Sequence, residues 1–140
     1  MAGPDAADAL GRDDLFQGLS PKDLAQVAEM TKERNFAVGQ SITEQGETGG
    51  RFYVLIEGQA DVMIGDDVVN SLKAGDSFGE ISLIDGQPRT ATIVARSPVR
   101  TLSLSSWNFR PLLKEHPSIA EGVLVQLCRR LRDVDASHLH

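Results

Sequence analysis

The sequence predicts a mainly β fold with flanking helices, in which a small all-β barrel or jelly roll forms the body. Short β-type runs divided by glycines fill the chain from about residue 34 to Leu104. Apolar residues recur at helical spacing on both sides of this region. The expected order of elements is therefore helix, β-roll, helix, helix. The dividing glycines are Gly39, Gly46, Gly49, Gly50, Gly58, Gly65, Gly75, Gly79 and Gly86.

The first helix is expected after a loose tail over residues 1–12, which is rich in Ala, Gly and Asp and shows no sustained periodicity. Ser20 has the features of an N-cap, because Pro21 follows at the first helical position and Asp23 lies in the first turn. The sequence therefore predicts a short helix over about residues 21–31. Its apolar stripe consists of Leu24, Val27 and Ala28.

Two pairs of strands are the clearest in the central region. Residues 51–56 and 59–64 are joined at Gly58, and residues 90–95 and 100–104 form the second pair. Apolar and polar residues alternate in the second strand, as in a half-buried strand. Its alternating apolar residues are Ala60, Val62 and Ile64.

Two helices are expected after the β region. Ser105 or Ser106 caps the first of them, and Pro111 keeps that helix short or bends it. Pro117 breaks the chain, and Ser118 then caps a final helix. The apolar residues of the final helix are Ile119, Val123, Leu127, Leu131 and Val134.

Length, charge and cysteine content restrict the class of protein. A chain of 140 residues suits one domain, and a net charge of -6 does not favour a nucleic-acid surface on this chain alone. The single cysteine, Cys128, excludes an internal disulfide framework and fits a cytoplasmic protein. No apolar run approaches the roughly 18 to 20 residues that a membrane-spanning helix needs.

The segment over residues 78–93 carries the functional information. It contains Phe-Gly-Glu-Ile-Ser-Leu from Phe78 and Pro-Arg-Thr-Ala from Pro88, without a gap. This segment closely resembles the phosphate-binding cassette of cyclic nucleotide-binding domains, a family that includes regulatory subunits of cAMP-dependent kinase, catabolite activator protein and cyclic-nucleotide-gated channels. The resemblance covers most of residues 15–135, so we place the domain at residues 13–136, with tails at 1–12 and 137–140.

The resemblance implies an eight-stranded antiparallel β-roll, one N-terminal helix, a short cassette helix and two C-terminal helices. It also implies a ligand, cAMP or cGMP, that the chain binds as a regulatory module with no metal and no catalysis. One departure is Gly50, where relatives often carry an acidic turn residue; we expect it to affect only a local turn. The downstream effector protein is not identified by the sequence.

A cyclic phosphodiester carries one negative charge, so its site needs one guanidinium and several backbone N–H donors. Arg89 supplies the cation, Gly79 permits close backbone approach, and a helical turn over residues 81–84 would present free N–H groups. The resemblance adds a ribose hydrogen bond to Glu80. It places the cassette residues Ile81, Ser82, Thr90 and Ala91 at the site as well.

The final helix resembles the family's lid, which closes over the base. Arg130 is the candidate for the capping contact, with Leu127 or Leu131 as alternatives. Thr90 bears on the choice between cAMP and cGMP, because family members that prefer cGMP often carry a hydroxyl at this position. Relatives that prefer cAMP also carry Ser or Thr there, so Thr90 does not require a preference for cGMP. We favour cAMP slightly.

Other functions are possible for a jelly-roll fold. A metal-dependent cupin enzyme needs several histidine ligands on its strands, and no histidine precedes His116. A sensor fragment of a transcription regulator or channel, and a degenerate fold that serves only protein contacts, stay open as alternatives. Cys128 and Trp107 are expected to pack in the interior.

Overall fold

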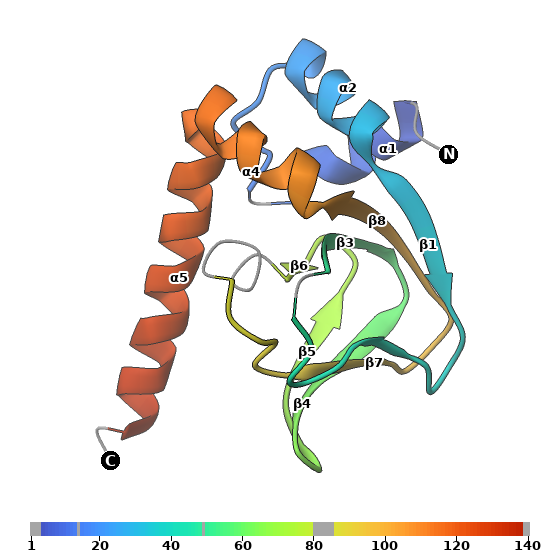
Figure 1. Cartoon of the computed structure of the whole chain (residues 1–140), viewed down its shortest axis with the longest axis vertical. Helices are drawn as coiled ribbons and strands as arrows, with labels where there is room; N and C mark the ends of the chain where they lie inside the picture. Colours follow the sequence, from blue (N-terminus) through green and yellow to red (C-terminus); the bar gives the residue numbers. More distant parts are fainter. Residues whose placement is uncertain (1–3, 14, 49, 80–85, 139–140) are drawn as a thin grey trace.

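The structure of the chain, a computed structural model, describes residues 4–13, 15–48, 50–79 and 86–138. Eight strands form the body, and the helices gather at one end and along one side of it (Figure 1). The elements are α1 (Pro4–Gly11), α2 (Pro21–Met30), β1 (Lys32–Phe36), β2 (Ser41–Thr43), β3 (Arg51–Glu57), β4 (Gln59–Ile64), β5 (Asp67–Lys73), β6 (Ser77–Phe78), β7 (Thr92–Ala95), β8 (Val99–Ser105), α4 (Ser106–Glu115) and α5 (Pro117–His138).

The N-terminal segment is a helix where a loose tail was expected, so that prediction is wrong for residues 4–11. Ala6, Ala9 and Leu10 are buried in the core, and Leu10 is fully covered. These residues stand three and four apart, so they share one helix face. The periodicity is short and two of its members are alanines, so the sequence carries only a weak signal for this helix.

Helix α2 confirms the predicted N-terminal helix. The Asp23 N–H donates a hydrogen bond to Ser20 Oγ at 3.2 Å, so Ser20 is the N-cap, and Pro21 is the first helical residue. Val27 and Ala28 face the core.

The eight strands form two four-stranded antiparallel sheets, with orders β1-β8-β3-β6 and β2-β7-β4-β5. The predicted eight-stranded β-roll is therefore confirmed, but the two predicted strand pairs are wrong. β3 and β4 follow each other in the chain yet lie in different sheets, as do β7 and β8. The chain passes from β3 to β4 at Gly58, where φ is 97° and an added Cβ would lie 2.3 Å from the Pro98 carbonyl oxygen. That turn leads the chain into the opposite sheet, and no hairpin forms.

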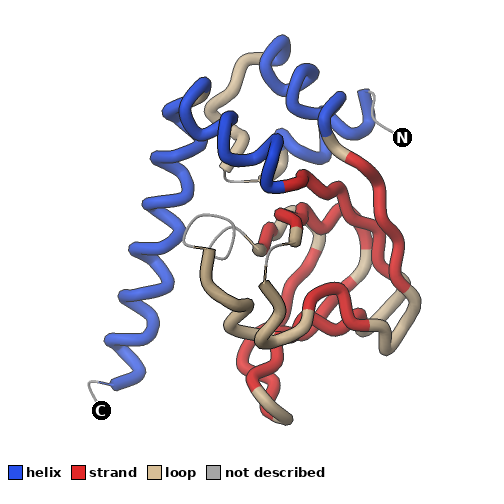
Figure 2. Tube along the Cα trace, viewed as in Figure 1, coloured by secondary structure: helices blue, strands red, loops and turns tan. Residues whose placement is uncertain are grey.

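Two apolar cores hold the molecule together. The first lies between the helices and the β1-β8-β3-β6 sheet, where Phe52 stacks on Phe109 with ring centroids 4.8 Å apart and meets Phe16 edge-on. The second lies between the two sheets and includes Tyr53 stacked on Phe78, with centroids 5.2 Å apart. Figure 2 shows the helices at one end of the strands and along one side of them, where the first core lies.

The C-terminal helices confirm the predicted break, because α4 ends at Glu115 and α5 begins at Pro117. Ser105 is the N-cap residue of α4, although its side chain makes no capping hydrogen bond. Trp107 is 86% exposed and Cys128 is exposed, so the expectation that these two residues pack in the interior is wrong. Both lie on the outer faces of their helices. Within the described residues, no helix has the length and apolar character that crossing a bilayer requires.

Candidate ligand-binding site

Arg89 lies at the centre of the candidate site and is only 7% exposed. Its Nη1 donates a hydrogen bond to the Gly79 carbonyl at 3.0 Å, and its Nη2 donates one to the Arg51 carbonyl at 2.7 Å. Its backbone is held by Glu47 and Gly46: the Arg89 N–H donates to the Glu47 carbonyl at 2.7 Å, and the Arg89 carbonyl accepts from Gly46 at 2.9 Å. The guanidinium is therefore fixed in place from the ends of β3 and β6 and from the loop before β3.

Two glycines allow the backbone to approach this guanidinium. Gly79 has φ of 98°, and an added Cβ would lie 2.6 Å from the Arg51 carbonyl oxygen and 2.8 Å from Arg89 Nη1. Gly50 has φ of 101°, and an added Cβ would lie 2.6 Å from Arg89 Nη2. Gly50 therefore contributes directly to the surroundings of Arg89, and the expectation that it affects only a local turn is wrong. The sequence shows that Gly50 departs from the family pattern, but it does not show that the Arg89 side chain lies next to this glycine.

The other cassette residues are described in part. Thr90 is exposed and Ala91 is half-buried, and both lie in the bend that leads into β7. Glu80, Ile81 and Ser82 lie outside the described residues, as does the expected helical turn at residues 81–84, so their roles stay predictions.

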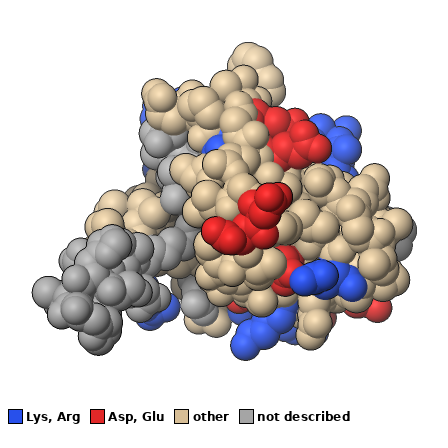
Figure 3. Space-filling view, turned by 90° about the horizontal axis from the view of Figure 1, so that it is seen from below, with Lys and Arg blue, Asp and Glu red and all other residues tan. Residues whose placement is uncertain are grey.

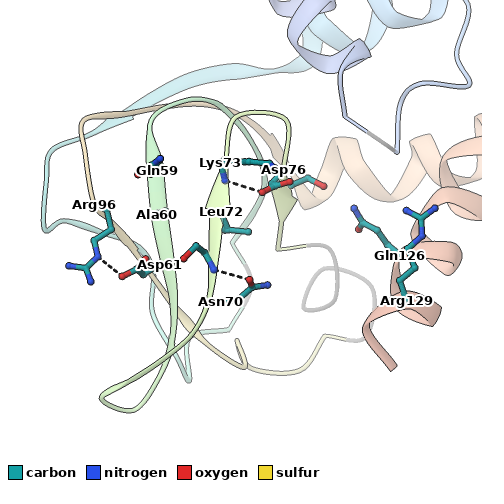
Figure 4. A pocket seen from close by; sticks show the side chains of 12 residues that line it. Gln59, Ala60, Asp61, Asn70, Leu72, Lys73, Asp76, Arg96, Gln126 and Arg129 are labelled. Atoms are coloured by element: carbon teal, nitrogen blue, oxygen red, sulfur yellow. Dashed lines mark hydrogen bonds and ion pairs between the residues drawn. The ribbon is translucent and has the colours of Figure 1, made fainter. Parts of the chain in front are cut away.

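A cavity of about 640 Å³ lies between the strands and α5 (Figure 4). Its walls come from β4, β5, the segment that enters β6, and α5. Ser77 and Gly79 are two residues apart, so their Cα atoms are at most about 7 Å from each other. Gly79 accepts the hydrogen bond from Arg89, so the guanidinium lies close along the chain to the cavity wall at Ser77, although neither Arg89 nor Gly79 lines the cavity itself. The lining residues are Gln59, Ala60, Asp61, Asn70, Ser71, Leu72, Lys73, Asp76, Ser77, Arg96, Gln126 and Arg129.

Helix α5 contributes Gln126 and Arg129 to this cavity, and neither was singled out in the sequence. Of the two apolar alternatives for the lid contact, Leu127 packs against the helical core, whereas Leu131 is 65% exposed. Arg130 lies on α5 four residues after Gln126, so the two positions share a side of the helix; its side chain lies outside the description. The hydrophobic periodicity of α5 indicates which side of the helix packs in the core. It does not indicate that the polar residues Gln126 and Arg129 line a cavity.

The cavity contains three basic and two acidic side chains, which suits a polar ligand. Asp61 is paired with Arg96, and Asp76 Oδ2 accepts a hydrogen bond from the Lys73 N–H at 2.9 Å. Among the described residues, Glu33 on β1 and Arg100 on β8 have shifted pKa values, and both lie away from this site. There, hydrogen bonds from Arg100 lower the pKa of Glu33, and Glu33 and Glu57 raise the pKa of Arg100.

Charged side chains of both signs are dispersed over the face shown in Figure 3, with no extended basic area among the side chains drawn there. Within the described part of the chain, no group of three or more His, Cys, Asp or Glu residues could hold a metal ion.

A family model of the cyclic nucleotide-binding domain matches residues 33–116, which is more than half of the chain. The chain belongs to this family. The resemblance inferred from the cassette is thereby confirmed, and the matched range includes Gly50, Gly79 and Arg89.

This cyclic nucleotide-binding domain has relatives among transcription regulators and channels. It is 32% identical over 130 residues to a CRP-like cAMP-activated global transcriptional regulator of Mycobacterium tuberculosis, covering 88% of this chain and 57% of the regulator. It is 38% identical over 107 residues to a cyclic nucleotide-gated potassium channel of Mesorhizobium japonicum, covering 76% of this chain and 30% of the channel.

Its fold matches the catabolite activator protein of Thermus thermophilus with a TM-score of 0.81 and 28% identity, over 89% of this chain and 61% of that chain. The chain thus spans little more than half the length of the regulator and less than a third of the channel.

Proposed function

We propose that this domain binds a cyclic nucleotide, with cAMP slightly favoured over cGMP, and reports its presence to an effector protein. The observation that carries the proposal is the buried Arg89 guanidinium, held by two backbone carbonyls between Gly50 and Gly79. A planar guanidinium in a partly desolvated site suits an anion with two exocyclic oxygens and a single charge. The cAMP preference is supported by the regulator from Mycobacterium tuberculosis, which is described as cAMP-activated.

In the proposed mode of binding, the phosphate contacts Arg89 and backbone amides near Ser82 and Ala91. The ribose contacts Glu80, and the base enters the cavity between β5 and α5. The support for this is that Ser77, which lines the cavity, lies two residues before Gly79, whose carbonyl accepts a hydrogen bond from Arg89. No metal is required, because the guanidinium and backbone donors neutralise the single charge.

The signal arises when α5 closes over the base. The support for this step is that Gln126 and Arg129 form the α5 wall of the cavity, opposite β4 and β5. A bound nucleotide therefore contacts the helix and the strands together. It shifts the equilibrium between the open and closed positions of α5 only by the difference between its affinities for these two states. The domain makes and breaks no bond, and Arg130 is the proposed capping residue.

The effector is an attached or separate protein of the kind found among the relatives, such as a promoter-binding domain or a channel. A cytoplasmic location, suggested by the single cysteine, is part of the proposal.

Isothermal titration calorimetry with cAMP and cGMP tests the proposal. The wild-type chain should bind at least one of them, and Arg89→Ala should weaken that binding about 30-fold or more, since the lost pairing contributes about 2 to 5 kcal/mol. Thermal unfolding of the variant checks that it is folded. A loss of less than about threefold would contradict the role of Arg89.

The second candidate is a degenerate domain that keeps the fold and serves only protein contacts. It is favoured if the wild-type chain gives no heat with either nucleotide at millimolar concentration.

A further inference from the structure

We propose that the outward face of α4 is a docking surface for a short acidic segment of the effector protein. This face, the Trp107 stripe, consists of Trp107, Arg110, Pro111 and Lys114. The inference rests on the proposed function, because it gives the chemistry of the partner to which the domain reports. None of the four residues lines the cavity.

Trp107 is the residue that marks this surface. It is the single tryptophan of the chain, and it is 86% exposed. A ring of this size gains more from leaving water than almost any other side chain. Tryptophan is also among the residues that contribute most to binding where two proteins meet. Its exposure on an ordered helix therefore favours a surface that a partner covers.

The four members of the stripe share one side of α4. Arg110, Pro111 and Lys114 follow Trp107 by three, four and seven residues, so all four lie within about a third of the helix circumference. All four are exposed, whereas the buried residues of α4 lie on its other side. The stripe is thus a continuous outer face.

Packing of the opposite side holds the stripe in position. Phe109 stacks on Phe52 of β3, and Leu112 is 1% exposed in the same core. α4 lies at the end of the β-roll, beside α5 and β8 (Figure 1). A surface that is already ordered loses little conformational entropy when a partner binds.

The charge of the stripe is opposite in sign to that of the chain. Arg110 and Lys114 are basic, and residues 86–114 contain no Asp or Glu, whereas the whole chain has a net charge of -6. Neither side chain forms an ion pair within the described residues. The stripe therefore complements an acidic partner. An extended polyanion such as a nucleic acid is disfavoured by the net charge, so a short acidic segment of a protein fits best.

The spacing of the stripe sets the pattern of that segment. From the rise of an α-helix, Trp107 and Arg110 are about 4.5 Å apart along the axis, and Arg110 and Lys114 about 6 Å apart. Alternate residues of an extended chain point to one side and stand about 6.6 Å apart. The partner is therefore an extended segment with an apolar residue followed by acidic residues at the next two alternate positions.

Tryptophan emission of the full chain tests the inference with the peptide acetyl-Leu-Ser-Glu-Ser-Glu-amide. Because Trp107 is the single tryptophan, its emission reports on the stripe directly. The peptide should shift the emission to shorter wavelength as the ring leaves water, with half-saturation below about 1 mM. The same peptide with Gln at both Glu positions should need a concentration about fivefold higher or more.

Variants of the chain test the basic residues separately. Arg110→Gln and Lys114→Gln should each raise the half-saturation concentration about two- to fivefold, because each removes one exposed ion pair. Arg34→Gln, which removes an exposed arginine on β1, is the matched control and should leave it unchanged. Trp107→Ala should give no heat with the peptide in calorimetry. Circular dichroism establishes that each variant is folded.

The other class of partner for a basic face with a tryptophan is an anionic membrane. Vesicles of phosphatidylcholine with phosphatidylserine are therefore titrated in parallel. An emission shift with these vesicles and none with the peptide would overturn the inference in favour of a membrane surface. An absence of any shift with the peptide at about 10 mM would also overturn it.

Calorimetry with cAMP and cGMP on the same variants separates the inference from the function beneath it. The stripe variants should keep the wild-type affinity for nucleotide. If the wild-type chain binds a nucleotide but not the peptide, the inference is wrong and the proposed function stands. If it binds the peptide but neither nucleotide, the proposed function is wrong and the stripe stands as a protein contact.

Discussion

Replacing Gly50 with alanine should weaken nucleotide binding by disturbing Arg89. The added Cβ would lie 2.6 Å from Arg89 Nη2, and ordinary contacts begin at 3.4 Å, so the guanidinium must move by about 0.8 Å. That movement strains or breaks the hydrogen bond from Nη2 to the Arg51 carbonyl, now 2.7 Å long. Hydrogen bonds of charged groups contribute about 1.5 to 3 kcal/mol, so we expect affinity to fall about tenfold or more.

Alanine at Gly50 also has an effect on stability, which a matched variant separates from the effect on binding. Gly39 has φ of 83° and no atom within 4 Å of an added Cβ, so Gly39→Ala adds backbone strain alone. Both variants should lose about 1 to 2 kcal/mol of unfolding free energy, because alanine is disfavoured at positive φ. Gly50→Ala displaces Arg89 Nη2, which is the end of a flexible side chain. The Gly50→Ala variant should therefore lose only slightly more unfolding free energy than Gly39→Ala.

The assay combines calorimetry for nucleotide affinity with urea unfolding followed by circular dichroism. Circular dichroism is preferable to tryptophan fluorescence because Trp107, the single tryptophan, is 86% exposed in the folded chain. The expected pattern is similar stability in the two variants and a loss of affinity only in Gly50→Ala. Equal affinities in the two variants would refute the contact between Gly50 and Arg89 as a determinant of binding.

Three further predictions concern stability, pH and base choice. Ser77→Ala should raise the unfolding free energy of the ligand-free chain by about 1 kcal/mol, and its Tm by a few degrees. The substitution removes a buried hydroxyl that has no hydrogen-bond partner among the described residues, and a lower Tm would show that the hydroxyl is stabilising. Arg100 lowers the pKa of Glu33 in the folded chain, so this pair stabilises above the unfolded value near 4.5 and loses its effect as pH falls through the folded pKa. Urea midpoints should therefore drop more steeply for the wild type than for Glu33→Gln between about pH 5 and pH 3, and parallel curves would contradict this. Thr90→Ala should weaken cGMP more than cAMP if its hydroxyl contacts the base, whereas equal losses in calorimetry would leave Thr90 with a backbone role.

The sequence contained enough information to predict most elements, because the relevant signals are local. The N-cap at Ser20, the break before Pro117 and the strand limits around Gly58 depend on backbone preferences of a few neighbouring residues. The pairing of those strands is not local. An alternation of apolar and polar residues shows which residues of a strand face a core, but it does not identify the neighbouring strand. The sequence therefore predicted that β3 pairs with β4, whereas the two strands lie in different sheets.

The errors at the helices have a related cause. Trp107 and Cys128 were expected in the interior from average residue preferences, yet both lie on outward helix faces. α1 was missed because alanines give a weak periodic signal, although Leu10 is fully buried by the helices that pack over it.

By itself the sequence determined the family and the β-roll, and its contiguous motif predicted Arg89 and Gly79 as site residues. Only the tertiary structure decided that Gly50 lies against Arg89, and that residues of β4, β5 and α5 line one cavity. Those residues come from segments separated by dozens of positions and are brought together by sheet pairing and helix packing. Proximity of this kind is set by the summed burial of both cores, which no short stretch of residues encodes.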